Sequence, residues 1–546
     1  MKDTDTGNAR QTSEFEIVID GCPVTVREGE TVLAGARRLG LDIPTLCYLP
    51  KCGPLTSCLV CLVKVRAEEG GGGRLVPSCG LEVQPGMVIE SETDEVRTAR
   101  RTALELLFSD HVGDCLAPCH RLCPLHLNIP VMLHQVETQT WDAATRTVLQ
   151  ALPMPAILGR LCHHPCENGC RRGTHDQPIA IRDVERLVAD RDLASSSPFL
   201  PPRKPAAGKS VAIIGAGPTG LAAAFFLLRE GHGVTIFDRH DKPGGSLRGE
   251  VDGGALESAT LDAEMNRLRA LGAQFSLGIE LGRDETLEGL LTRFDAVLVA
   301  WGRKEKALAS LALATTPTGI RADPLTAATS QARVFAAGAA VRPIKHLVRA
   351  MSEGRSAALA VHRSLLGLKA AGEQRLFSSV MGRLSAPELG LFLVGHNPAP
   401  RISPAQGVLR GFTALEGRGE AGRCLHCDCR AEGNCQLQHY GELYGVEPGR
   451  FRSQRRPFEQ HLERGEIVFE PGKCILCGIC VRITELAREP LGLTFIGRGF
   501  DVRVAAPLDR AIADGLQKVA RECVEACPTG ALAFKHDLPP PPRESA

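Results

Sequence analysis

The feature that most constrains the fold is a glycine-rich turn between an apolar strand pattern and an Ala/Leu-rich helical pattern. Residues 211–214 form the strand pattern, and a second apolar run at 234–237 ends at Asp238. Three glycines follow the first run at the spacing G-x-G-x-x-G: Gly215, Gly217 and Gly220. Such glycines permit a tight turn, let backbone approach a pyrophosphate and let a helix pack against a strand. With an acid about 20 residues on to bind ribose hydroxyls, the pattern predicts a dinucleotide site in a parallel α/β sheet.

Further residues around this turn resemble a known family. Pro218 inside the turn and a Gly-Gly pair after the second strand resemble the FAD fingerprint of the glutamate synthase small subunit and of the related half of dihydropyrimidine dehydrogenase. The stretches FDAVLVAWG (294–302) and VFAAG (334–338) resemble that family's returning strands. The resemblance implies that FAD is bound by Gly215, Gly217, Pro218, Gly220, Asp238, Gly244, Gly245 and Gly338. The family has an Asp that binds the ribityl chain where this chain has Ala339.

The same family carries a whole second Rossmann domain, for NADPH, between those two stretches. Here only 31 residues separate Gly302 from Val334. A dinucleotide domain needs several βαβ units of about 30 residues or more each, and no second glycine fingerprint occurs in the sequence. We therefore expect the NAD(P)-binding domain to be missing and the chain to have no NAD(P) site of its own.

Composition limits the remaining possibilities. The length of 546 residues predicts roughly three to five domains. Basic and acidic residues nearly balance, for a net charge of +1, and aromatic residues make up 4%, so no nucleic acid is expected as a partner. The absence of a leader and of a long apolar run predicts a cytoplasmic chain without a membrane span. The 21 cysteines cluster at metal-ligand spacings, which indicates bound metal in a reducing compartment rather than disulfides.

Four cysteines near the amino terminus predict an iron–sulfur centre. They stand in CYLPKCGPLTSCLVCLVKV and LVPSCG, as Cys47, Cys58, Cys61 and Cys79. Three thiolates from one loop and a fourth from a later strand suit a 2Fe–2S cluster, and zinc is the alternative on ligand types. The segment resembles the 2Fe–2S domain that opens the large iron–sulfur subunit of respiratory complex I and of iron-only hydrogenases. The resemblance implies a β-grasp domain over residues 14–95.

Two more cysteine runs lie in a segment of helical pattern. Together with a preceding histidine they are His111, Cys115, Cys119, Cys123, Cys162, Cys166 and Cys170. Six thiolates suit two 4Fe–4S clusters and leave two ligands to other residues. SDHVGDC resembles the His-ligand segment of the complex I subunit, while CPLHLNIP and CHHPCENGC resemble the two-cluster domain of the glutamate synthase small subunit.

The second resemblance implies a helical two-cluster domain over residues 96–200. One cluster would then be held by Cys115, Cys119 and Cys170, with His111 as the candidate fourth ligand. The other would be held by Cys123, Cys162 and Cys166, with Glu185 as the candidate fourth ligand.

The carboxyl-terminal third contains two further cysteine groups. In the region 368–460, a compact site for a 4Fe–4S cluster or tetrahedral zinc is predicted by Cys424, Cys427, Cys429 and Cys435. Residues 461–536 resemble bacterial-type ferredoxin, which implies one 4Fe–4S cluster on Cys474, Cys477, Cys480 and Cys527. Thr484 stands where a two-cluster ferredoxin has another cysteine. Among the remaining cysteines, Cys52 can compete in the 2Fe–2S loop, and we expect Cys22 to be buried and Cys523 to be structural.

These segments predict a multidomain α/β and α+β protein with a β-grasp 2Fe–2S domain, a helical two-cluster domain, a Rossmann-like FAD domain (207–367) and a bacterial-ferredoxin-like domain. With FAD, one 2Fe–2S cluster and about four 4Fe–4S clusters, the expected function is that of an electron-transfer subunit in a soluble multisubunit oxidoreductase. The expected partners are an NAD(P)H-oxidising flavin subunit and a terminal metalloenzyme subunit. The alternative is an electron wire or scaffold with a degenerate FAD domain.

Overall fold

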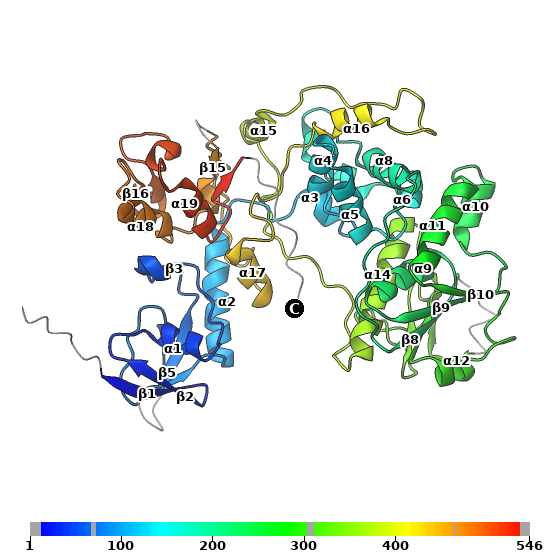
Figure 1. Cartoon of the computed structure of the whole chain (residues 1–546), viewed down its shortest axis with the longest axis horizontal. Helices are drawn as coiled ribbons and strands as arrows, with labels where there is room; N and C mark the ends of the chain where they lie inside the picture. The colour runs from blue at the N-terminus through cyan, green and yellow to red at the C-terminus, as the bar shows by residue number, and fades with distance from the viewer. Residues whose placement is uncertain (1–12, 67–72, 303–310, 463–465, 536–546) are drawn as a thin grey trace, which may run out of the picture. The chain divides into compact units, whose positions relative to one another are not determined.

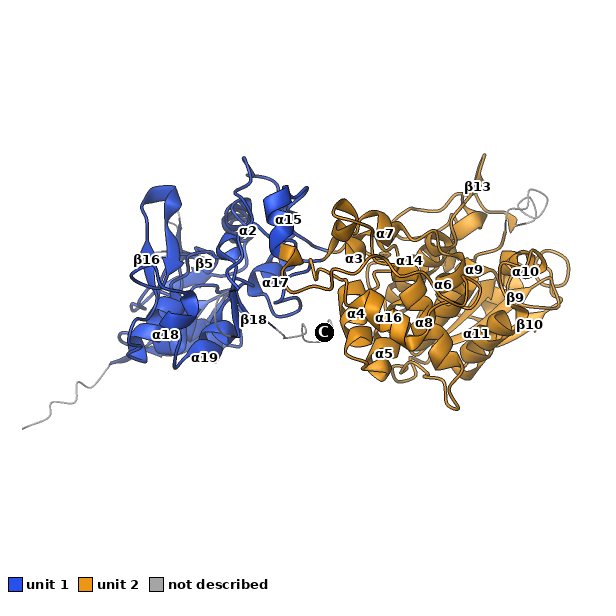
Figure 2. Ribbon diagram, turned by 90° about the horizontal axis from the view of Figure 1, so that it is seen from above, with its two compact units in different colours: residues 1–116, 377–391, 428–546 blue, residues 117–376, 392–427 orange. Residues whose placement is uncertain are grey.

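A computed structural model describes residues 13–66, 73–302, 311–462 and 466–535 of the chain (Figure 1). It divides into two compact units (Figure 2). Unit 1 comprises residues 1–116, 377–391 and 428–546, and unit 2 comprises residues 117–376 and 392–427. Each unit is therefore assembled from segments that lie far apart in the sequence, and the region 368–460 is shared between the two.

The amino-terminal part of unit 1 contains a five-stranded mixed sheet in the order β2-β1-β7-β5-β6. Its strands are β1 (Glu14–Ile19), β2 (Cys22–Arg27), β5 (Leu62–Arg66), β6 (Arg74–Pro77) and β7 (Val88–Glu90). β1 and β7 are parallel, and the other pairs are antiparallel. Alternating residues face a core that the helix α1 (Val32–Arg38) covers. Cys22 is exposed, contrary to expectation, because it begins β2 ahead of the inward-facing Val24 and Val26.

The helix α2 (Asp94–Ser109) links this sheet to the later parts of unit 1. Thr93 caps its first turn by accepting a hydrogen bond from the backbone N–H of Val96. The fully buried Arg100 donates to the carbonyl oxygen of Leu62 at 2.9 Å and to the hydroxyl of Tyr444 at 2.8 Å. These bonds join α2 to β5 on one side and to the end of α17 (Gln436–Leu443) on the other.

The carboxyl-terminal part of unit 1 is built from two short antiparallel pairs and two helices. The pairs are β15 (Ile467–Phe469) with β18 (Leu532–Phe534), and β16 (Thr494–Ile496) with β17 (Arg503–Ala505). The helices are α18 (Ile479–Leu486) and α19 (Ala520–Ala526). Within α15 (Ala386–Leu393), the chain passes from unit 1 to unit 2 after residue 391. Cys523 on α19 is completely buried, and its thiol donates to the carbonyl oxygen of Cys480 at 3.9 Å, as a structural residue should.

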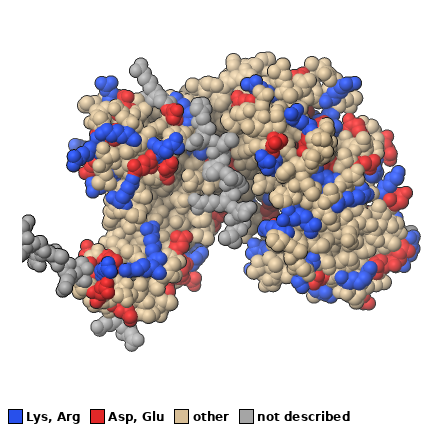
Figure 3. Space-filling view, in the orientation of Figure 1, with Lys and Arg blue, Asp and Glu red and all other residues tan. Residues whose placement is uncertain are grey.

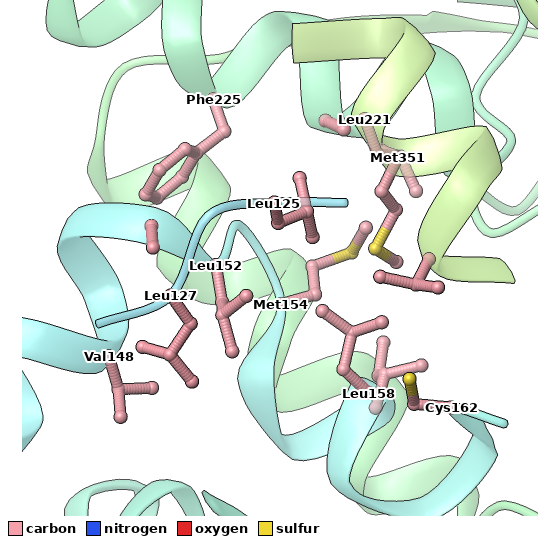
Figure 4. Close-up of a cluster of buried hydrophobic side chains, with 14 of the residues drawn as sticks. Leu125, Leu127, Val148, Leu152, Met154, Leu158, Cys162, Leu221, Phe225 and Met351 are labelled. Carbon is pink, nitrogen blue, oxygen red and sulfur yellow. The ribbon is translucent and has the colours of Figure 1, made fainter. Parts of the chain in front are cut away.

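Unit 2 opens with a group of short helices. They are α3 (Pro118–Leu122), α4 (Ile129–Glu137), α5 (Trp141–Ala151), α6 (Pro155–Leu161), α7 (Pro165–Asn168) and α8 (Ile181–Leu193), joined later in the chain by α16 (Ala414–Ala421). Proline at the first position of a helix is favourable because the N–H there has no intrahelical partner. Figure 4 shows apolar side chains of this group, such as Leu152 and Leu158, facing Leu221, Phe225 and Met351. The helical group and the sheet of unit 2 therefore share one core.

The second part of unit 2 is a five-stranded sheet in the order β10-β9-β8-β11-β14. The strands are β8 (Ser210–Ile214), β9 (Gly233–Asp238), β10 (Gln274–Leu277), β11 (Ala296–Val299) and β14 (Val334–Ala336), and all pairs are parallel. Its helices are α9 (Pro218–Arg229), α10 (Ser246–Asp252), α11 (Ser258–Ala270), α12 (Leu287–Arg293) and α14 (Leu347–Leu365). The predicted parallel α/β sheet is confirmed.

The stretch between β11 and β14 is short. Its described residues, 300–302 and 311–333, contain the hairpin β12 (Thr315–Thr316) and β13 (Gly319–Ile320), and no parallel strand pair occurs among them. Acidic and basic side chains intermingle on the face shown in Figure 3, in keeping with the net charge of +1. None of the helices in the described ranges has the length and apolar character needed to cross a membrane.

Candidate cofactor sites

The four amino-terminal cysteines gather as a set in unit 1, here called the amino-terminal site. Cys47, Cys58, Cys61 and Cys79 are all at most 4% exposed. Hydrogen bonds with the Cys58 and Cys79 thiols lower the pKa of Cys47, and a hydrogen bond with Cys79 lowers the pKa of Cys61 to about 6. The backbone N–H of Cys58 donates to the sulfur of Cys47 at 3.5 Å. Four buried sulfurs in mutual contact fit a 2Fe–2S cluster, in which each iron takes two thiolates.

A second set lies in unit 2 and is called the glutamate site. A hollow of about 310 Å³ is lined by Cys123, Cys162, Cys166 and Glu185. Its walls are otherwise apolar and include Leu127, Leu152 and Leu158, and Figure 4 shows Leu158 next to Cys162. Burial raises the pKa of Glu185 to about 8, and its Oε1 atom has no hydrogen-bond partner among the described residues. A buried carboxylate oxygen left over beside three thiols fits a fourth ligand to a 4Fe–4S cluster.

A third set, also in unit 2, differs from the expected grouping and is called the split site. A hollow of about 340 Å³ is lined by Cys119, Cys170, Cys424 and Cys427. Burial raises the pKa of Cys119, and the neighbouring thiols of Cys170 and Cys424 raise it further. Arg171 and Arg172 also line this hollow. The sequence placed Cys119 and Cys170 with Cys115 and His111, and that grouping is wrong.

The fourth set lies in unit 1 and is called the histidine site. It combines the two residues that were expected to join Cys119 and Cys170 with the two cysteines that were expected to join Cys424 and Cys427. Its candidate members, which all lie in unit 1, are His111, Cys115, Cys429 and Cys435. The backbone N–H of Cys429 donates to the carbonyl oxygen of Cys115 at 3.2 Å. Burial raises the pKa of Cys115 to about 12, with Cys429 as the next cause, and Cys435 is influenced by both thiols after burial. The run from Cys424 to Cys435 therefore does not form one compact site.

The imidazole of His111 is suited to complete this fourth set. Its side chain is 8% exposed, and its Nδ1 atom has no hydrogen-bond partner in the described ranges. Burial lowers the pKa of His111 to about 3, with the ammonium of Lys473 as the next cause. The same ammonium lies 3.6 Å from the sulfur of Cys429. A neutral imidazole is the form that binds iron, so the environment fits a His/Cys ligand set.

The exchange of partners follows from how the chain enters and leaves unit 2. Residue 116 is the last of unit 1 before unit 2 begins, and residue 428 is where the chain finally returns. His111-x3-Cys115 and Cys429-x5-Cys435 stand on the two sides of this insertion. The same eight residues were predicted as ligands, but close spacing along the chain assigned them to the wrong partners. The SDHVGDC resemblance to a His-ligand segment was the signal that pointed to the correct separation.

The last cysteine set forms the carboxyl-terminal site of unit 1. A hollow of about 380 Å³ is lined by Cys474, Cys477, Cys480 and Cys527 and by apolar side chains. Burial raises the pKa of Cys474 to about 11, and its sulfur accepts a hydrogen bond from the backbone N–H of Leu476 at 3.4 Å. Thr484 is 2% exposed and accepts a hydrogen bond from the backbone N–H of Leu493 at 3.1 Å. Thr484 therefore stabilises the local fold at the position where a two-cluster ferredoxin has a cluster ligand.

The glycine-rich turn of unit 2 has the geometry of a nucleotide cradle. A Cβ atom on Gly220 would lie 2.0 Å from the carbonyl oxygen of Gly215, and one on Gly245 would lie 2.7 Å from the Cα of Gly217. A Cβ on Gly217 would meet no atom within 4 Å, so its backbone faces open space. Asp238 ends β9 and accepts a hydrogen bond from the backbone N–H of Ala216 at 2.7 Å. The turn thus has the close packing and the open approach that a pyrophosphate requires.

The returning strand β14 is followed by a further glycine, Gly338, which lies against the same turn. Gly338 has φ +70°, and a Cβ atom there would lie 2.4 Å from the Oγ1 of Thr219 on α9. Its backbone N–H donates to the Oε2 of Glu353 at 3.1 Å, and that carboxylate also pairs with Arg342. Ala339 supplies no polar group beside Gly338. The cradle fits a dinucleotide, while the ribityl contact of the related family has no equivalent at this position.

Comparison with family models assigns three parts of the chain. Residues 12–94 match a 2Fe-2S iron-sulfur cluster binding domain, and residues 106–197 match the 4Fe-4S cluster domain II of dihydropyrimidine dehydrogenase. Residues 213–275 match an NAD(P)-binding Rossmann-like domain. The resemblances to these domains are confirmed, and the chain is a multidomain α/β protein with 2Fe–2S, 4Fe–4S and Rossmann-like domains.

Curated relatives are subunits of oxidoreductases. The NADP(+)-dependent formate dehydrogenase subunit beta of Moorella thermoacetica is 36% identical over 263 residues, 43% of this chain and 37% of the relative. The glutamate synthase [NADPH] small chain of Mycobacterium tuberculosis is 38% identical over 192 residues, 35% of this chain and 39% of the relative. The NAD-dependent dihydropyrimidine dehydrogenase subunit PreT of Escherichia coli O157:H7 is 34% identical over 188 residues, 34% of this chain and 45% of the relative. The chain spans less than half the length of each.

Proposed function

We propose that this chain is the electron-transfer subunit of a multisubunit oxidoreductase and carries FAD, one 2Fe–2S cluster and about four 4Fe–4S clusters. The observation that carries the proposal is that one chain contains five four-residue ligand sets and one dinucleotide turn. When bound, the clusters carry single electrons and the flavin exchanges between one-electron and two-electron chemistry. The matched relatives are themselves oxidoreductase subunits, which supports the same class for this chain.

The protein's own contribution is to bind and insulate these groups. In three of the five sets every cysteine is buried, and the split and carboxyl-terminal sets combine buried with half-buried cysteines. Three of the sets line hollows, and the walls of the glutamate site are apolar apart from its ligands. Removing water and lowering the local dielectric around a cluster shifts its reduction potential and slows the release of the cluster from the protein. All 21 cysteines are unpaired, which favours a reducing compartment and hence the cytoplasm.

The proposed partners follow from the short stretch between the two returning strands of the Rossmann-like domain. With 31 residues between Gly302 and Val334, no room remains for the second Rossmann domain that handles NADPH in the related family. A separate subunit that oxidises NAD(P)H is therefore one proposed partner. A terminal subunit containing molybdenum, tungsten, nickel–iron or a heterodisulfide-reductase-like centre is the other, by analogy alone.

Cofactor content of the anaerobically purified chain tests this function. We expect about 18 iron atoms and about one FAD per chain, because one 2Fe–2S and four 4Fe–4S clusters contain that much iron. The competing function, a cluster-bearing wire with a degenerate FAD domain, rests on Ala339 and predicts the same iron without flavin. A free-standing NAD(P)H dehydrogenase is the third possibility. Catalytic reduction of the isolated chain by NADPH in an anaerobic titration would support that third function and overturn our proposal.

A further inference from the structure

Two histidines and a glutamate gather in unit 2 outside the five ligand sets. His134 and Glu137 lie in the last turn of α4, and His426 comes from the loop that follows α16. One ring nitrogen of each histidine and one carboxylate oxygen lie within 4.8 Å of one another. All three side chains are half-buried. None of the iron–sulfur ligand sets uses these residues.

The local structure brings the three side chains together for identifiable reasons. Residues three apart on a helix share a face, so His134 and Glu137 project side by side from α4. His426 has φ +42°, in the left-handed region, and its ring stands edge-on to that of His134 with centroids 5.7 Å apart. Gly422 caps the end of α16, and a Cβ atom there would lie 3.2 Å from the Oε1 of Glu137. A residue without a side chain thus leaves room for the carboxylate.

Two imidazoles and one carboxylate are a ligand set for a borderline divalent ion. Zn²⁺ and Fe²⁺ accept this combination, whereas Ca²⁺ and Mg²⁺ prefer oxygen ligands. At metal–ligand distances of about 2.0–2.1 Å, tetrahedral ligand atoms lie roughly 3.4 Å apart, so the set must close by at most about 1.4 Å. Half-buried side chains achieve such a movement by small rotations. Three protein ligands leave a fourth position open to water or to another donor.

We propose that His134, Glu137 and His426 form a mononuclear site for a divalent transition-metal ion, and that Zn²⁺ is the probe that reveals it. His426 stands between Cys424 and Cys427, which belong to the split site. A cation bound by His426 therefore adds positive charge next to the ligands of one 4Fe–4S cluster. Positive charge stabilises the reduced, more negative cluster, so the metal raises that cluster's reduction potential.

The test is zinc uptake by the iron-loaded, full-length chain, read by zinc K-edge X-ray absorption. This method sees zinc alone and separates nitrogen and oxygen ligands at about 2.0–2.1 Å from sulfur ligands at about 2.3 Å. We expect about one equivalent of zinc with nitrogen and oxygen ligands only. Zinc that has replaced iron in a cysteine set would show sulfur neighbours instead.

Two variants and one control connect the uptake to these residues. Glu137→Gln keeps the side chain's shape and should weaken zinc binding at least 10-fold, and the double variant with His134→Ala should abolish it. His175→Ala removes an exposed histidine of the same unit and should bind zinc as the wild type does. Iron and flavin contents measured on each variant show that unit 2 has folded. Zinc should also raise the potential of one cluster in the wild type but not in the double variant.

Three results would overturn the proposal. The first is that all bound zinc has sulfur ligands. The second is that the double variant binds zinc as the wild type does, and the third is that the His175→Ala control loses zinc binding. Zinc uptake is independent of the electron-transfer function, because it is measured without flavin turnover or a redox partner. The potential shift alone rests on the proposed cluster of the split site.

Discussion

The buried ammonium of Lys473 offers a quantitative test of the histidine site. Its side chain is 4% exposed, and its Nζ lies 3.6 Å from the sulfur of Cys429. Burial disfavours the charged form, but the Cys429 thiolate and the paired carboxylate of Glu470 outweigh it and raise the pKa of Lys473. Lys473 is therefore a fixed positive charge beside a cluster ligand. Such a charge favours the reduced cluster, and removing it should lower the reduction potential.

The size of the effect can be worked from this geometry. Taking about 6 Å from Nζ to the cluster centre and an effective dielectric of about 20, the charge contributes about 2.8 kcal/mol. For a one-electron couple, about 1.4 kcal/mol corresponds to 59 mV, so Lys473→Met should lower the potential by about 120 mV. Solvent screening and rearrangement around the Glu470 carboxylate, which loses its ion-pair partner, offset part of this change. We therefore expect a decrease of roughly 60–120 mV.

The assay is an anaerobic redox titration followed by electron paramagnetic resonance. The cluster of the histidine site is recognised by the nitrogen coupling that an imidazole ligand gives. Lys473→Arg keeps the charge and should change the potential little, whereas the double variant Lys473→Met/Glu470→Gln removes both charges and should shift it less than Lys473→Met does. A shift of that cluster below about 20 mV in Lys473→Met, or a shift upward, would refute the reasoning.

Two further predictions concern the fold of unit 2. Hydrogen bonds from Arg172 hold the pKa of Asp176 well below its usual value of 3.8. The ion pair therefore contributes its full stability above about pH 3.8, and this contribution is lost as the pH falls through the lower pKa of the folded state. Asp176→Asn should lower the free energy of unfolding, measured by urea denaturation, by about 1–3 kcal/mol at pH 7. The difference from the wild type should shrink below about pH 4, and an equal difference at pH 2 would contradict this prediction. Gly338→Ala should lose FAD, because its Cβ would lie 2.4 Å from the Oγ1 of Thr219, while the control Gly249→Ala, with no atom within 4 Å, should keep FAD and be neutral or stabilising. Equal flavin content in the two variants would argue against the role of Gly338.

The parts of the fold that are determined by residues close together in the sequence were predictable from the sequence. The turn at Gly215 and the strand that ends at Asp238 are local patterns, and the parallel sheet follows from them. The cysteines of the carboxyl-terminal and glutamate sites also gather as the motifs imply. In each case the ligands belong to one unit and to a pattern with a recognisable spacing.

The grouping of the other ligands could not be obtained in that way. Cys427 and Cys429 are two residues apart in sequence, yet they belong to different units. Cys115 and Cys429 are more than 300 residues apart, yet their backbones share a hydrogen bond. Cluster ligands are selected by tertiary placement, and an insertion between them removes the sequence signal of their proximity. Cys22 was expected to be buried and is exposed, because it is the first residue of β2 and lies beyond the part of the strand that packs on the core.

The measurement that tests the account most directly is the pairing of His111 with its thiolate partners. Cys429→Ala and Cys119→Ala should be compared by the nitrogen-coupled signal of the imidazole-ligated cluster in the reduced, iron-loaded chain. Our account predicts that Cys429→Ala abolishes this signal and that Cys119→Ala leaves it intact. Loss of the signal in Cys119→Ala and its survival in Cys429→Ala would contradict the ligand sets, and with them the proposed arrangement of cofactors.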